Sequence, residues 1–186
     1  MTGTSSRSLV VGLATHLLQF FPLSCFLLVA FRRGAPNLED WLLAFMVGGA
    51  IAVLQVALTP AFSRGRPLNR MLLGVNAYLT VGGFSALANQ LWILQSLNDL
   101  RESGLFLCIL AVGVVTTFGS RAGFVGQADR ADGSKAKRDS LVLLALAIVA
   151  TIPSFLFRGH LLVSAVIPLT LLTIANRWLR NRTPQA

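Results

Sequence analysis

The feature that most constrains this chain is a series of six long stretches that contain no Asp, Glu, Lys or Arg. In chain order they hold 24, 23, 28, 18, 18 and 18 residues. A helix needs about 20 mainly apolar residues to cross about 30 Å of hydrocarbon, where its backbone must satisfy its own hydrogen bonds. The sequence therefore predicts an all-α, polytopic membrane helical bundle that forms one integral membrane domain over residues 1–186. The six transmembrane helices are expected at residues 9–31, 41–61, 71–97, 103–119, 140–157 and 160–178.

The composition agrees with a chain whose main solvent is lipid. Charged residues make up 12% of the sequence and hydrophobic residues 54%, whereas soluble domains carry about 25% charged residues. A net charge of +9 would suit nucleic-acid binding. The cations lie between apolar runs, however, so we expect no nucleic-acid partner. The expected partners are membrane lipids, with anionic headgroups at the cytoplasmic face.

The distribution of Lys and Arg predicts the orientation, because these residues are enriched on the cytoplasmic side of a membrane. The amino terminus, the second and fourth loops and the carboxyl terminus together hold 12 of them, and the other side holds 4. Both termini are therefore expected in the cytoplasm of a multi-pass protein of the bacterial inner membrane. Residues 120–139 are expected to form a flexible cytoplasmic loop.

The last two apolar runs are separated only by a short polar connection, Arg158 to His160. A single helix over both would be about 57 Å long at about 1.5 Å per residue, which exceeds one bilayer. We expect two spanning helices joined by a tight turn, with a reentrant pair as the alternative.

Small residues mark the faces on which these helices are expected to pack. In lipid, helices associate through close contacts of small side chains and through interhelical hydrogen bonds. Two such faces occur, on the second and third predicted helices: Ala44, Gly48 and Ala52, then Gly82, Gly83 and Ala86. These faces are also compatible with self-association into a homo-oligomer.

Polar side chains at the expected membrane depth form the candidate site. An unpaired polar group is costly in lipid, so these side chains should point into the bundle. The candidates are His16, Gln19, Gln55, Asn76, Asn89 and Gln90, with Thr116 and Thr117 on the fourth helix. They either bond across helices, at about 0.6 kcal/mol each, or line a polar pocket for a lipid or a small solute.

The sequence offers no set of residues for catalysis, metal binding or a cofactor. Cys25 and Cys108 fall inside apolar runs and have no metal-ligand spacing. Asp129, Asp132 and Gly133 resemble the start of a CDP-alcohol phosphotransferase signature, but no acid follows Asp139 to complete it. We therefore expect no catalytic residue, no metal and no cofactor, and we expect that the chain is not an enzyme.

Three short segments resemble the intracellular septation protein A family, the YciB/IspZ-like inner-membrane proteins. They are Leu17 to Pro22, which includes Phe20 and Phe21, then Ala52 to Ala57 around Gln55, and the pair Gly82 and Gly83. Gln19 departs from the family pattern, which usually has an acid at that position. The resemblance covers the first three helices, and it implies contact with integral envelope-synthesis or division proteins.

The expected function is therefore that of a noncatalytic inner-membrane protein, which takes part in cell-envelope maintenance and cell division through membrane protein interactions. A small transporter or substrate-binding membrane subunit is the first alternative, motivated by the polar residues of the first three helices. An immunity protein against a membrane-active toxin is the second, because such proteins are small, helical and free of motifs.

Overall fold

The computed structural model describes residues 20–34, 36–62, 69–126 and 133–181. Within these ranges all the regular elements are helical. The chain begins there with the helix Phe20–Ala30. It continues through six α-helices and one π-helical segment: α2 (Leu38–Phe62), α3 (Arg70–Leu87), α4 (Leu91–Leu100), α5 (Glu102–Gly119), α6 (Gly133–Leu156), η1 (Leu162–Val166) and α7 (Ile167–Asn181).

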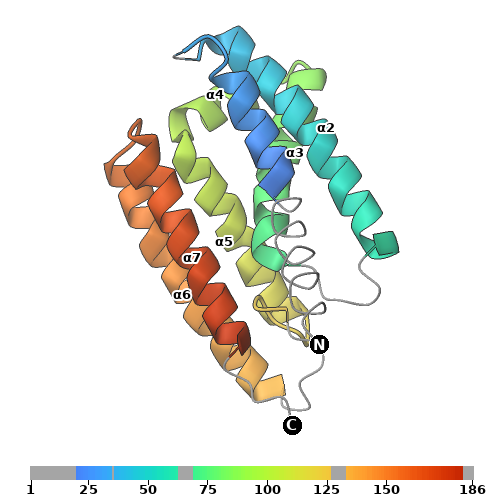
Figure 1. Ribbon diagram of the computed structural model, residues 1–186, viewed down its shortest axis with the longest axis vertical. Helices are drawn as coiled ribbons and strands as arrows, with labels where there is room; N and C mark the ends of the chain where they lie inside the picture. Colours follow the sequence, from blue (N-terminus) through green and yellow to red (C-terminus); the bar gives the residue numbers. More distant parts are fainter. Residues whose placement is uncertain (1–19, 35, 63–68, 127–132, 182–186) are drawn as a thin grey trace, which may run out of the picture.

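The long helices run alternately up and down, and chain neighbours pack side by side in the order α2, α3, α5, α6, α7 (Figure 1). The α6–α7 pair lies on one side of the bundle and α2 on the other. Four segments are long and apolar enough to cross a membrane: Leu38–Thr59, Glu102–Gly119, Ser134–Leu156 and Leu162–Arg180. The predicted all-α membrane bundle is thus confirmed, and the chain is a multi-pass membrane protein. The total of six crossings stays a prediction.

The predicted third helix, 71–97, is divided in the structure into α3 and α4. The break occurs at Asn89, which adopts a left-handed backbone conformation with φ 53°. The N–H of Gln90 donates to the carbonyl of Ser85 at 2.8 Å, and the N–H of Asn89 donates to Ala86 at 3.3 Å. These two bonds form a Schellman motif, and Asn is among the residues that tolerate its left-handed position. Asn89 therefore lies in the turn that ends α3 instead of inside a continuous helix.

The connection between α6 and α7 is a tight turn, as expected for two separate helices. Phe157 to Gly159 form the turn, and Gly159 has φ 87°, which favours glycine. The two helices then lie next to each other in opposite directions (Figure 1). The π-helical segment η1 precedes Pro168, and its last bond joins the N–H of Ile167 to the carbonyl of Leu162. Proline lacks an N–H, which explains a local change of hydrogen-bond register at this point.

The predicted flexible loop 120–139 is shorter in the structure. Helix α6 begins at Gly133, and residues 121–126 form compact turns against the bundle. Phe124 and Val125 are each 1% exposed. The expectation of a flexible loop was wrong for residues 121–126, because the apolar side chains of Phe124 and Val125 pack into the core.

Glycines bring the backbones of α2 and α3 together. A Cβ on Gly83 would lie 2.7 Å from the carbonyl oxygen of Phe45 and 3.0 Å from the Cα of Gly49. The predicted small-residue faces are indeed turned inward: Ala44 and Ala52 are fully buried, Gly48, Gly82 and Gly83 are buried, and Ala86 is partly buried. Gly49, which was not among the candidates, makes an equally close approach, because a Cβ there would lie 2.7 Å from the carbonyl oxygen of Leu79.

A Gly83→Ala substitution should destabilise the bundle by about 1–3 kcal/mol, because the added methyl group would force two backbones apart. Gly119→Ala is the matched control, since a Cβ there meets nothing within 4 Å. Alanine favours a helix over glycine, so the control should be neutral or more stable by up to about 1 kcal/mol. Unfolding of the purified protein in mixed micelles measures both changes, and equal effects would contradict the packing argument.

Candidate functional site

The alternating helix directions gather most of the described cations at one end of the bundle. At this end α3 and α6 begin and α5 and α7 end, at the bottom of Figure 1. Among the described residues, seven cations lie there with one acid, Asp139, whereas the opposite end has four cations and four acids. The seven are Arg70, Arg121, Lys135, Lys137, Arg138, Arg177 and Arg180. We call this the cationic end and take it as the candidate site.

Arg70 fastens the turns after α5 to the start of α3. Its guanidinium donates to the hydroxyl of Ser120 at 2.8 Å and to the carbonyl of Gly123. Gly123 has φ 59°, and a Cβ there would collide with the hydroxyl of Ser140. That hydroxyl donates to the carbonyl of Ala136 at 2.7 Å. The cationic end is therefore an ordered surface over residues 120–126.

Two amide pairs join helices in the same half of the molecule. The amide of Asn76 on α3 donates to the side-chain oxygen of Gln55 on α2 at 2.9 Å. The amide of Asn176 on α7 donates to the side-chain oxygen of Asn69, which immediately precedes α3, at 3.1 Å. Both bonds connect different elements, so these polar groups tie the bundle together.

Three buried oxygens in this half have no hydrogen-bond partner within the described residues. They are the side-chain oxygens of Asn76, Thr117 and Asn176. Leaving such a group unsatisfied costs about 1–3 kcal/mol. The half of the bundle near the cationic end therefore contains buried oxygens that can still accept a hydrogen bond.

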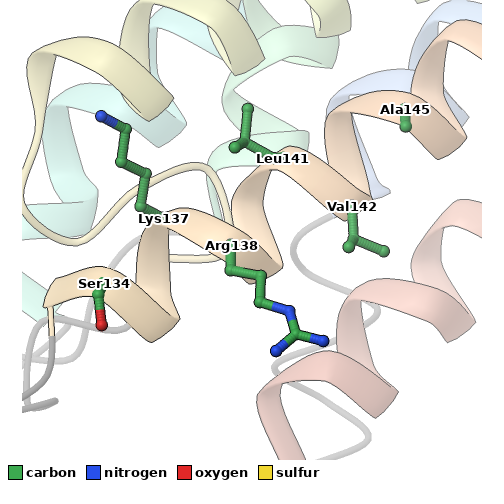
Figure 2. Close-up of a pocket in the computed structure, with 6 residues that line it drawn as sticks. All are labelled: Ser134, Lys137, Arg138, Leu141, Val142 and Ala145. Carbon is green, nitrogen blue, oxygen red and sulfur yellow. The ribbon is translucent and has the colours of Figure 1, made fainter.

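A shallow groove follows the first half of α6 at the cationic end. Its volume is about 490 Å³, and it is lined by Ser134, Lys137, Arg138, Leu141, Val142 and Ala145. Figure 2 shows that Lys137 and Arg138 diverge from α6, Lys137 toward α5 and Arg138 toward α7. The Lys137 ammonium lies 5.9 Å from the centroid of the Phe118 ring on α5. The groove thus has cations at one end and apolar side chains at the other.

The structure separates the predicted polar cluster into two places. Gln55 and Asn76 meet, whereas Asn89 and Gln90 are exposed at the turn between α3 and α4. Asn89 follows Asn76 by thirteen positions, or about 20 Å along a helix axis. Gln90 accepts a hydrogen bond from the indole of Trp92 at 3.0 Å. The prediction of one common polar site was therefore wrong for these four residues. The Schellman motif places Asn89 and Gln90 at an exposed turn, away from Gln55 and Asn76.

The remaining candidates have mixed positions. His16 and Gln19 lie outside the described residues. Phe20 is partly buried, Phe21 is exposed and Pro22 is buried. The hydroxyl of Thr116 bonds to the carbonyl of Val112, one turn earlier on its own helix, at 2.7 Å.

Asp40 carries a buried carboxyl group that was not among the residues predicted from the sequence. It is fully buried, and one carboxylate oxygen accepts a hydrogen bond from the Nε of Arg32 at 3.0 Å. Asn37 caps α2 by accepting the N–H of Asp40 at 2.8 Å. The pair Arg32 and Arg33, shortly before Asp40, was the available signal.

The described residues bring together no group of three His, Cys, Asp or Glu side chains that could hold a metal ion. No family model, curated protein or solved structure matches this chain.

The bond between Gln55 and Asn76 should appear as a coupling energy of about 0.6 kcal/mol in a double-mutant cycle, the average for such pairs in lipid. The cycle uses Gln55→Leu, Asn76→Leu and the double variant, measured by unfolding in mixed micelles. It is needed because Gln55 makes a further interaction, whose loss a single variant would include. A cycle of Gln55→Leu with Asn176→Leu, on helices separated by α3, is the control and should give no coupling. Equal coupling energies in the two cycles would contradict a direct interaction between Gln55 and Asn76.

Proposed function

We propose that this chain is a noncatalytic protein of the bacterial inner membrane that works through contacts with other integral membrane proteins. The observation that carries the proposal is the use of polar side chains inside the bundle. The pairs Gln55–Asn76 and Asn69–Asn176 each join two elements. The hydroxyl of Ser103 on α5 likewise donates to a carbonyl of α6 at 3.0 Å. The amide and hydroxyl hydrogens that make these interhelical bonds stabilise a scaffold.

The finer proposal is a role in cell-envelope maintenance and cell division, with integral envelope-synthesis or division proteins as partners. Its support is the resemblance to the septation protein family around Phe20 to Pro22, Gln55, and Gly82 with Gly83. In the bundle Pro22 and both glycines are buried. Such buried positions would contribute to partner binding by maintaining the shape of the scaffold.

A small transporter or substrate-binding membrane subunit is the second candidate. The specific observation in its favour is the set of unpartnered buried oxygens on Asn76, Thr117 and Asn176. A solute with hydrogen-bond donors would satisfy them. Against it, Gln55 is already paired and Asn89 lies outside the bundle, so the polar lining expected for a pathway is not assembled from these residues.

Partner contact should be detectable by photocrosslinking in native membranes. A diazirine analogue of leucine would replace one of three leucines on outward faces: Leu87 on α3, Leu156 on α6 or Leu171 on α7, which are 73%, 72% and 61% exposed. At least one position should give an adduct with an integral protein of envelope synthesis or division, identified by mass spectrometry. Leu79, which is fully buried, is the control and should crosslink only within the chain. Adducts with lipid alone at all three positions would contradict the proposal.

The orientation is open to an independent test with introduced cysteines. Lys135 marks the cationic end and Gln95, on α4, the opposite end, and both are exposed. With Cys25 and Cys108 replaced by alanine, a membrane-impermeant maleimide should label Gln95→Cys in intact cells. It should label Lys135→Cys only after permeabilisation, because cations favour the cytoplasmic side. The reverse pattern would overturn the proposed orientation.

A further inference from the structure

We infer that the groove along the first half of α6 binds one anionic phospholipid from the leaflet at the cationic end. Its six lining residues recur every three or four positions, so they occupy one face of the helix. Ser134 and Ala145, at its two ends, are separated by about 16 Å along the helix axis. This site goes beyond the proposed function, since it needs no protein partner.

The polar end of the groove suits a phosphate group. Lys137 and Arg138 leave the helix on either side of the groove (Figure 2). A guanidinium can donate two parallel hydrogen bonds to phosphate oxygens, and an ammonium adds a point charge. Ser134 places a hydroxyl in the first turn of α6, where the helix dipole also favours an anion. The contact of Lys137 with the ring of Phe118 holds its side chain toward α5.

The apolar end suits an acyl chain. Leu141 and Val142 are 44% and 43% exposed, and Ala145 is exposed as well. The 24 residues of α6 extend over about 36 Å, whereas hydrocarbon is about 30 Å thick. The first turn therefore lies among headgroups when the rest of the helix spans the bilayer. This arrangement puts Lys137 and Arg138 at the boundary of the hydrocarbon, from which long cationic side chains reach the phosphates, and it puts Ala145 within the hydrocarbon.

Charge complementarity selects a lipid over a second copy of this chain. A parallel copy in the same membrane would bring its own cationic end to the same depth, and like charges would repel. A soluble phosphate would neutralise the cations but leave the exposed side chains of Leu141 and Val142 uncovered. A diacyl phospholipid with a negative headgroup satisfies both ends of the groove.

The test is native mass spectrometry of the purified full chain in detergent, titrated with phosphatidylglycerol or with phosphatidylcholine that has the same acyl chains. We expect one phosphatidylglycerol per chain to bind clearly more tightly than phosphatidylcholine. The double variant Lys137→Gln/Arg138→Gln should lose about 25-fold in phosphatidylglycerol affinity, because each cation near an anionic headgroup contributes about fivefold. Both side chains are exposed, and an unchanged unfolding midpoint checks that the variant folds.

The matched control is Arg121→Gln/Lys135→Gln, which removes two exposed cations of the same end that do not line the groove. It should keep the affinity of the unmodified protein. Ala145→Phe retains every charge but fills the apolar end, so it should also weaken lipid binding. Three results would each overturn the site: equal loss in the two double variants, which indicates diffuse attraction; equal binding of both lipids; or full competition by soluble glycerol phosphate, which indicates a headgroup site without an acyl chain.

Discussion

The close approach of α2 and α3 at Gly49 and Gly83 is the contact on which the rest of the bundle depends. In lipid, apolar side chains gain little by leaving one hydrocarbon surface for another, so backbones must come near enough for dispersion contacts to accumulate. A Cβ on Gly49 would lie 2.7 Å from the carbonyl oxygen of Leu79, which leaves no space for a larger residue. Gly74, nearer the beginning of α3, makes a similar close approach to α5. A Cβ there would lie 2.6 Å from the Cα of Ile109.

The two ends of the bundle are held by different interactions. At the cationic end, Arg70 binds the turns that follow α5, and amide pairs connect α3 to α2 and to α7. At the opposite end, the rings of Phe26 and Phe45 pack with centroids 4.9 Å apart. The buried carboxylate of Asp40 pairs there with Arg32. Because the charges at the opposite end balance among the described residues, the excess of positive charge in this part of the chain lies at the cationic end.

That asymmetry links the proposed scaffold role to the groove on α6. A cationic rim beside exposed apolar side chains would retain anionic lipid next to the helices that a membrane partner could meet. At the opposite end, α4 buries Leu94 and Leu97 and exposes Trp92, which is 66% exposed. An amphipathic helix with an exposed tryptophan is typical of the membrane interface. The cations at one end and the exposed Trp92 at the other are thus both of the kinds that are common at membrane interfaces.

The sequence by itself determined the class of fold, because the length and polarity of a segment decide whether it partitions into lipid, whatever its neighbours are. It also located the inward faces of Ala44, Gly48 and Ala52, since small residues at helical spacing have few other uses in a membrane. The tertiary structure alone decided which polar residues meet. Gln55 reaches Asn76 because of the register in which α2 packs on α3, and Asn89 is excluded because a local capping motif ends α3 before it. The burial of Asp40 and the groove on α6 depend on how helices turn about their axes, which the pattern of charges along a chain does not specify.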